Sequence, residues 1–173
     1  MTSRIKIILL LILLPFAVFS QCKFKQTIDT FENDTLFHLD ELVGSVGLGN
    51  TMTISIESSK GQNFVSLTML MFSNTNVFIS KNSVLSFKLD NDSIISVSAI
   101  SDFTGQVKRS GSYLYSFTQP RYFLPLDVLK ILSIHKINMI RANMFESNFT
   151  IEIRSNRQEN IQEAFRCLLD KFN

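Results

Sequence analysis

The sequence lacks most of the features from which a function can be inferred. It has no Lys- or Arg-rich run, no internal repeat or low-complexity tract, and neither of the motifs GxSxG and HExxH. Without a basic run, nothing indicates the surface with which proteins bind nucleic acid or anionic membranes. Without the two motifs, the usual signatures of serine hydrolases and zinc proteases are missing. We therefore predict no catalytic, cofactor-binding or metal-binding residue and no cofactor, and we expect a protein that is not an enzyme.

The first 20 residues have the three parts of a secretory signal peptide. Arg4 and Lys6 form a basic start, residues 7–19 are an apolar run interrupted only by Pro15, and Ser20 ends the segment with a small residue. These 13 residues are too few to cross a bilayer, which takes about 20. We predict cleavage after Ser20, no transmembrane segment in the mature chain, and an extracytoplasmic location, periplasmic or secreted.

The mature chain has no net charge. The whole sequence has 17 basic and 15 acidic residues, and two of the basic ones lie in the signal segment, which leaves 15 of each. Hydrophobic residues make up 45% of the sequence, which suits one globular domain with its own core. We predict a single domain over residues 21–173.

Two cysteines remain in the mature chain, Cys22 and Cys167. A bacterial lipoprotein has a small residue just before its lipid-bearing cysteine, whereas Phe19 and Gln21 occupy the positions before Cys22, which disfavours a lipid anchor there. Cys167 falls away from the centre of the apolar stripe of the last helix, where a free thiol would be exposed in an oxidising compartment. We predict a Cys22–Cys167 disulfide; two unrelated free thiols are the alternative.

Apolar and polar residues alternate over most of the mature chain, which is typical of half-buried β-strands. Asp90–Ser93 supplies turn residues between two such runs and indicates a hairpin. The run Phe64–Phe72 is apolar on both faces and is predicted to be a central strand. Strands are expected at Met52–Ile56, Phe64–Phe72, Val77–Ile79, Leu85–Leu89, Ile95–Ala99, Tyr113–Phe117, Ile137–Ala142 and Phe149–Ile153.

Helical spacing replaces this pattern twice in the C-terminal third. Pro125 is suited to the first turn of one helix, and an apolar stripe at Ile161–Phe172 marks the other. The sequences SNRQ at 155–158 and NRQE at 156–159 are alternative capping boxes for the second helix. Together the patterns predict an α+β domain, mainly antiparallel β-sheet with two helices in the C-terminal third.

Three short motifs resemble functional sites but are better explained structurally. The glycine-rich run at residues 44–49 is not followed by the GK[ST] sequence that ends a phosphate-binding loop, so we expect an inter-strand loop. Asp90–Asp92 opens like a calcium loop, but Ile95 stands where such a loop needs glycine. His38 can pair with Asp40 on one strand face, and without a second histidine at ligand spacing we expect a surface pair.

Three segments, "NSVLSFKLDNDSIISVSA" at 82–99, "RYFLPLDVLKILSIHKINMIRAN" at 121–143 and "NIQEAFRCLL" at 160–169, share an order of elements with a known group. The chain resembles a family of small secreted bacterial β-rich proteins of unknown function. In that pattern a hairpin precedes a tyrosine-led stretch, a short helix, an Ile-x-x-Ile-Arg strand and a terminal helix. Tyr122 and residues 137–141 match it here. The resemblance implies a β-rich fold and a bacterial origin, and no activity.

The leading hypothesis is a non-enzymatic extracytoplasmic domain that binds an unknown protein partner or serves as a structural component of the cell envelope. The alternative is a carrier for a small apolar molecule or lipid, because 16 phenylalanines and the two-faced strand Phe64–Phe72 could line a cavity between sheet and helices. The same aromatic residues could instead fill an ordinary core.

Overall fold

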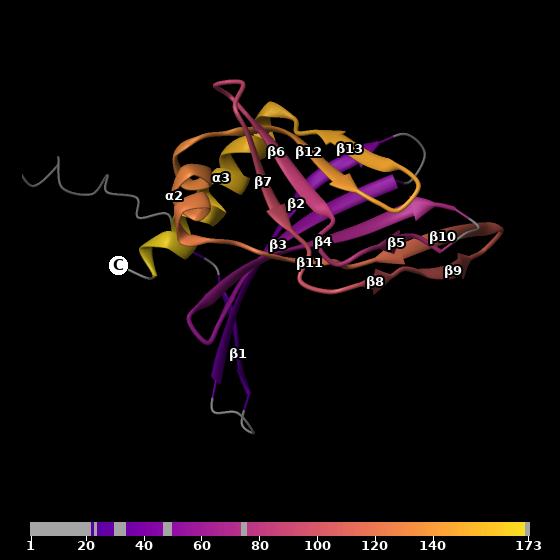
Figure 1. Cartoon of the computed structure of the whole chain (residues 1–173), viewed down its shortest axis with the longest axis horizontal. Helices are drawn as coiled ribbons and strands as arrows, with labels where there is room; N and C mark the ends of the chain where they lie inside the picture. Colours follow the sequence, from indigo (N-terminus) through magenta and orange to yellow (C-terminus); the bar gives the residue numbers. More distant parts are fainter. Residues whose placement is uncertain (1–21, 23, 30–33, 47–49, 74–75, 172–173) are drawn as a thin grey trace, which may run out of the picture.

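The computed structural model describes residues 22, 24–29, 34–46, 50–73 and 76–171 (Figure 1). The predicted signal segment lies outside these residues. The described strands are β1 Lys25–Asp29, β2 Asp34–Val46, β3 Asn50–Ser59, β4 Gln62–Phe72, β5 Phe78–Ile79, β6 Val84–Leu89, β7 Ile94–Ser98, β8 Phe103–Thr104, β9 Gln106–Ser110, β10 Tyr113–Thr118, β11 Arg121–Phe123, β12 Ile137–Asn143 and β13 Asn148–Glu152. The described helices are α2 Leu126–Ile134, which directly follows Pro125, and α3 Ser155–Asp170. The predicted class, mainly antiparallel β-sheet with two helices late in the chain, is confirmed.

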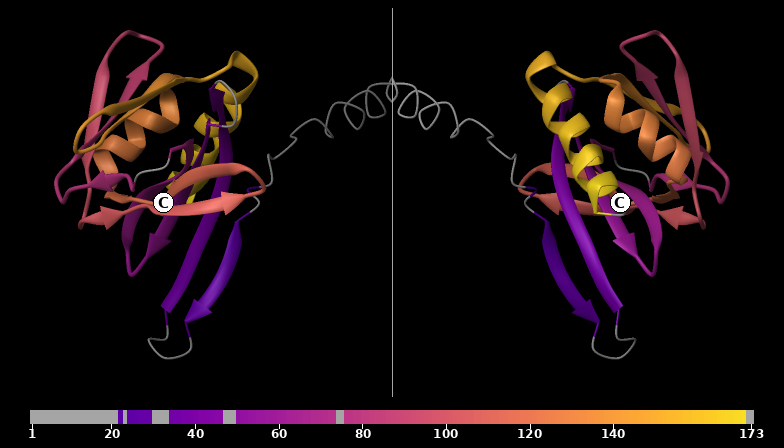
Figure 2. Two further views of the ribbon diagram at one scale, coloured as in Figure 1. Left: turned by 90° about the vertical axis from the view of Figure 1, so that its right-hand side faces the viewer. Right: turned by 90° about the vertical axis from the view of Figure 1, so that its left-hand side faces the viewer.

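The described strands form two main sheets and one small one, and all of their pairings are antiparallel. The large sheet has the order β1-β2-β3-β4-β10-β9, with β11 beside the start of β4 and β10 beside its end. The second sheet has the order β13-β12-β6-β7, and β5 pairs with β8. Asp90–Ser93 joins β6 to β7, so the predicted hairpin is confirmed. The two helices lie together at one end of the molecule (Figures 1 and 2).

The core lies between the inner faces of the two main sheets. Because successive side chains of a strand point to opposite faces, every second residue of β3, β4 and β6 is buried. At the helical end, the ring of Phe165 from α3 meets the ring of Phe87 edge-on, with centroids 6.4 Å apart. β4 has neighbours on both sides, as predicted for a central strand. Its inward side chains are those of Val65, Leu67, Met69 and Met71.

The predicted capping boxes of the last helix are wrong. α3 begins at Ser155, its N-cap residue is Arg154, and no side chain caps it. The Gln158 side chain reaches back past the N-cap residue but caps no amide: its Nε2 donates to the carbonyl of Ile153 at 3.0 Å and to Asn138 Oδ1 at 3.2 Å. Gln158 thus ties α3 to the neighbouring strands. No helix among the described residues is long and apolar enough to cross a bilayer.

A disulfide joins Cys22 to Cys167 of α3, with Cα atoms 5.6 Å apart, so the predicted pair is confirmed. Cys167 is only 4% exposed. The expectation that it lies on an exposed side of the helix is wrong, because β2 packs against α3 and Cys22 covers the Cys167 sulfur. β1 follows Cys22 and, with the first part of β2, forms an arm that projects from the body (Figures 1 and 2).

The glycine-rich run at residues 44–49 is only partly a loop. Gly44 and the two residues after it belong to β2, so the loop prediction is wrong for them, and residues 47–49 lie outside the described residues. β2 continues through a bulge between Leu42 and Gly44. Gly44 passes Ile151 of β13 there, whose Cδ1 would lie 3.4 Å from an added Cβ, an ordinary contact distance.

Gly105 lies between β8 and β9, close to β10 and to the residue before β5. An added Cβ would lie 3.0 Å from Ser116 Oγ and 3.1 Å from the carbonyl oxygens of Val77 and Phe117. The amide of Gly105 also donates to the carbonyl of Val77 at 2.6 Å, which holds its backbone in this position. Only glycine allows so close an approach of these segments.

Candidate functional site

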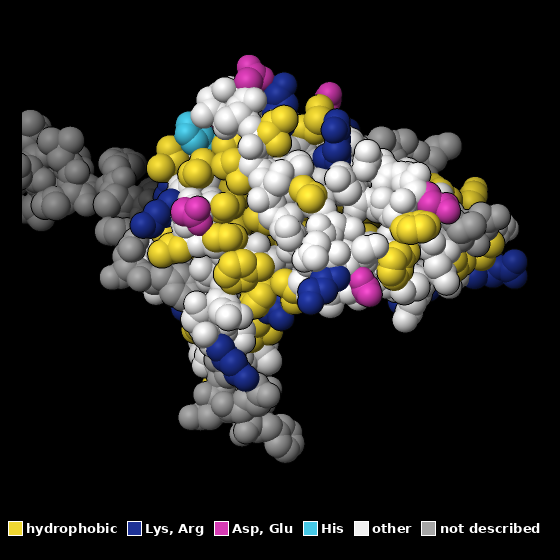
Figure 3. All heavy atoms as spheres, viewed as in Figure 1, with side chains coloured by type: hydrophobic (Ala, Val, Ile, Leu, Met, Phe, Trp, Pro, Cys, Tyr) yellow, Lys and Arg dark blue, Asp and Glu magenta, His cyan; other side chains and the backbone are white. Residues whose placement is uncertain are grey.

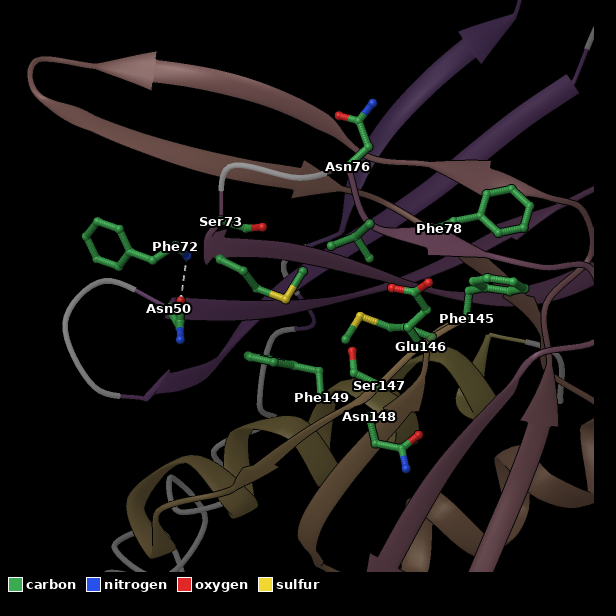
Figure 4. Close-up of a pocket in the computed structure, with 13 residues that line it drawn as sticks. Asn50, Phe72, Ser73, Asn76, Phe78, Phe145, Glu146, Ser147, Asn148 and Phe149 are labelled. Atoms are coloured by element: carbon green, nitrogen blue, oxygen red, sulfur yellow. Dashed lines mark hydrogen bonds between the residues drawn. The ribbon is translucent and has the colours of Figure 1, made fainter.

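A cleft of about 470 Å³ (Figure 4) opens beside β5, which Figure 1 places at the end of the molecule away from the helices. Its walls come from the start of β3, the end of β4, β5 and the turn between β12 and β13. This volume lies within the range of about 300–1,000 Å³ that is usual for small-molecule sites. Four phenylalanines line the cleft: Phe72, Phe78, Phe145 and Phe149.

The turn between β12 and β13 places two of the lining residues. The amide of Met144 donates to the carbonyl of Ser147 at 2.9 Å, which closes the turn, and the amide of Phe145 donates to the carbonyl of Phe78 at 3.0 Å, which fixes it to β5. The rings of Phe145 and Phe78 meet edge to face, with centroids 6.1 Å apart. The turn also presents Glu146 to the cleft (Figure 4).

Polar side chains share the walls with these rings. Asn50 Oδ1 accepts a hydrogen bond from the amide of Phe72 at 2.7 Å, which joins the start of β3 to the end of β4. Asn76, Asn148 and Glu146 also line the cleft. Seven of the 13 lining residues are apolar and six are polar, so a ligand in the cleft would meet aromatic surface and hydrogen-bonding groups together.

The outer surface at this end of the molecule carries a few exposed apolar side chains. Figure 3 shows them in yellow near β5 and the β12–β13 turn, on a surface that is otherwise mostly white there, and a larger yellow group over α2 at the other end. Phe145 is 72% exposed, Phe72 38% and Phe78 36%. Large apolar side chains that cluster on a surface, rather than lying singly, mark binding sites.

A second cleft, of about 390 Å³, lies beside the disulfide between β2 and α3. β1 begins at Lys25, which pairs with His38 of β2. The residues of β2 after His38 therefore have no described strand beside them on the edge that β1 occupies earlier along β2. The side chains of Glu41 and Glu163 line it, and no phenylalanine or tyrosine does. Burial raises the pKa of Glu41 above its usual value, against the opposing effect of the positive charge on Arg157. Without aromatic walls, this cleft is the weaker candidate for ligand binding.

His38 and Asp40 lie on the outer face of the large sheet and pair as predicted, with His38 Nε2 2.8 Å from Asp40 Oδ1. Asp40 also accepts a hydrogen bond from Ser55 Oγ at 2.6 Å and lies 3.5 Å from Lys25 Nζ. Burial tends to raise the pKa of Asp40. The hydrogen bond from Ser55 and the nearby His38 outweigh that effect, so the pKa of Asp40 lies below its usual value.

Glu57 of β3 extends this group into an ion-pair network whose members lie on β1, β2, β3 and β11. His38 Nδ1 lies 3.6 Å from Glu57 Oε1, and Arg121 Nε lies 3.0 Å from Glu57 Oε2. Ser66 Oγ donates to Glu57 Oε1 at 3.1 Å. Both ring nitrogens of His38 therefore face carboxylates, and the hydroxyl groups of the network donate to carboxylates as well. Among the described contacts of the network, no serine hydroxyl donates to His38, so it does not contain the serine–histidine pair of a hydrolase triad.

The second histidine, His135, has a separate partner. Its Nδ1 lies 3.0 Å from Asp90 Oδ1 in the β6–β7 hairpin. In the same turn, Asn91 Oδ1 accepts a hydrogen bond from the amide of Ser93 at 3.0 Å, so Asp90–Asp92 acts as the predicted turn. In the part of the chain that the structure describes, no three His, Cys, Asp or Glu side chains are grouped to hold a metal ion.

The sequence pattern does not indicate the cleft. Its residues come from four separate segments, at 50, 71–73, 76–78 and 144–149, and the local patterns of these segments show only strands and turns. A local signal exists only at Phe145, a large apolar residue in a turn. The contact of His38 with Glu57 was missed for a related reason, because it depends on the register between β2 and β3.

Comparisons of the chain with models of protein families, with curated proteins and with solved structures find no match. The resemblance to secreted bacterial β-rich proteins therefore stays a prediction. The function has to be inferred from the cleft itself.

Proposed function

We propose that this protein is a non-enzymatic extracytoplasmic domain that binds a small organic ligand in the phenylalanine-lined cleft. The extracytoplasmic part of the proposal rests on the signal-peptide pattern of residues 1–20 and on the disulfide, a bond that persists in oxidising compartments. The binding part rests on one observation: four phenylalanines line a cleft of about 470 Å³ at one end of the molecule.

Exposure of these rings supports binding over packing. A ring that only fills the core is buried, as Phe87 and Phe165 are, whereas Phe145 remains 72% exposed. Covering such a ring with a ligand removes apolar surface from water at about 25 cal/mol per Å². A purely structural envelope component needs no concave site, so the cleft favours ligand binding over a structural role.

A carrier for purely apolar molecules is the second candidate. The inward side chains of the strand Phe64–Phe72 pack in the core between the sheets. The cleft takes only Met71 and Phe72 from the end of this strand, is open to solvent and carries Asn76, Asn148 and Glu146 on its walls. Those polar groups favour a ligand that combines an apolar part with polar groups over a lipid chain alone.

The proposal is tested with a fragment library on the mature, oxidised protein, by thermal shift and ligand-observed NMR. We expect ligands whose affinity falls about tenfold or more in Phe145→Ala, since burying such a ring contributes about 1.5 kcal/mol or more. Ile134→Ala is the matched control, because Ile134 is 68% exposed at the helical end of the molecule and should leave affinity unchanged. A library without ligands, or ligands that bind Phe145→Ala as tightly as the parent, contradicts the proposal.

A further inference from the structure

Charge within the cleft indicates the class of ligand. Glu146 is the one charged side chain among the residues that line the cleft, and no lysine, arginine or histidine lines it. Among the described residues, no side chain forms an ion pair or hydrogen bond with Glu146. Figure 4 shows its carboxylate pointing into the cleft. An unpaired carboxylate in this position attracts cations and repels anions.

Elsewhere in the protein, phenylalanine rings are covered by its own cations. Four such contacts lie outside the cleft among the described residues: Lys171 Nζ is 3.1 Å from the ring centroid of Phe37 and 5.4 Å from that of Phe24, Arg121 Cζ is 3.8 Å from that of Phe64, and Lys108 Nζ is 4.7 Å from that of Phe117. Within the described residues, no lysine or arginine lies over a phenylalanine of the cleft. Phe72 packs on Tyr115, with ring centroids 4.6 Å apart, whereas the exposed rings of Phe78 and Phe145 carry no cation among the described residues and can receive one from a ligand.

The arrangement of the rings suits a compact positive group. The planes of Phe78 and Phe145 stand at 75° to each other, so the two rings form adjoining sides of a partial cage. Glu146 follows Phe145 in the turn, and its side chain lines the same cleft. Aromatic faces combined with a carboxylate are the groups by which proteins recognise ammonium ions.

Amide side chains on the walls of the cleft can form hydrogen bonds with the rest of the ligand. Asn76 and Asn148 line the cleft, and each offers a donor and an acceptor to a ligand hydroxyl or carbonyl. Asn50 is less free, because its Oδ1 already accepts from the amide of Phe72.

We infer that the cleft selects organic cations, that is, compounds in which an ammonium group is joined to a short polar or apolar tail; the inference rests on the proposed function. The positive group lies against the rings of Phe78 and Phe145 and is neutralised by Glu146. The tail extends toward the amides.

The test compares two probes of the same shape, choline and its uncharged analogue 3,3-dimethylbutan-1-ol, titrated into the mature, oxidised protein by NMR. We expect choline to bind about tenfold more tightly than the analogue. Glu146→Gln should bring the ratio of the two affinities close to one. Glu152→Gln is the matched control, because it removes the same charge from an exposed residue outside the cleft and should keep the ratio. Raising the salt concentration should weaken the binding of choline and leave the binding of the analogue unchanged.

Equal affinity for the two probes overturns the inference and leaves the proposed function standing, because the cleft still binds a ligand. A preference for choline that survives Glu146→Gln also overturns it. If neither probe binds while a library ligand binds in a Phe145-dependent manner, the cation class is wrong and ligand binding is right. If neither the probes nor the library bind, both proposals fail.

Discussion

Removal of the Cys22–Cys167 disulfide should cost most of the stability of the domain. The two cysteines are 145 residues apart in a sequence of 173, so the bond closes most of the chain into a loop. In the chain-entropy model, opening a loop of that length raises the entropy of the unfolded chain by an amount worth roughly 5 kcal/mol at 25 °C. The total stability of a domain is about 5–15 kcal/mol. We therefore expect Cys22→Ala/Cys167→Ala to be marginally folded or unfolded at 37 °C.

The effect is measured by urea unfolding, followed by circular dichroism, on the oxidised protein, the reduced protein and the double variant. The reduced protein and the double variant should agree, which separates loss of the bond from any effect of the alanines. Their m-value should exceed that of the oxidised protein, since the unfolded chain without the bond is more expanded. A double variant within about 1 kcal/mol of the oxidised protein would refute the reasoning, because it would mean that the unfolded chain is compact without the bond.

Three further changes test the packing and electrostatics. Glu41→Gln should raise the melting temperature at pH 7 and not at pH 3. Burial raises the pKa of Glu41, so the protonated carboxyl stabilises the fold below the usual pKa of 4.5, and this contribution is lost as the pH rises through the raised pKa. An equal gain at both pH values would contradict this. Tyr122→Phe should leave the melting temperature unchanged or raise it by a few degrees, because Tyr122 is fully buried and its hydroxyl has no partner among the described residues; a loss above about 1 kcal/mol would reveal a hydrogen bond there. Gly105→Ala should cost about 1–3 kcal/mol in urea unfolding, whereas Gly44→Ala, with ordinary contact distances, should cost clearly less; equal costs would show that the close approach at Gly105 relaxes.

Elements with an apolar face could be predicted from the sequence. β4, the β6–β7 hairpin and both helices carry regular apolar spacing because one of their faces packs in the core. β1 and β9 lack this spacing: their sequences KQTID and QVKRS are mostly polar, because β1 lies in the projecting arm and β9 at the edge of the sheet. Their pairing comes from backbone hydrogen bonds, which leave little trace in side-chain pattern.

The sites also divide into those that a local sequence pattern indicates and those that it does not. The disulfide could be predicted because only two cysteines remain after the signal segment. The pair of His38 and Asp40 could be predicted because residues two apart in a strand share a face. The cleft could not, because it exists only once the ends of β4 and β12 are brought side by side by the stacking of two sheets. Long-range geometry of this kind is not present in any single stretch of sequence.

The disulfide also decides how the molecule responds to a protease. Every peptide bond between Cys22 and Cys167 lies within one covalent ring, so a single cut anywhere in it releases nothing. The mass rises only by the water taken up at the cut, and two pieces separate only on a reducing gel. After a cut in the arm, the short piece stays tethered to α3 at high effective concentration and can remain paired with β2. Loss of the arm then takes two chemical events, a cut and a reduction.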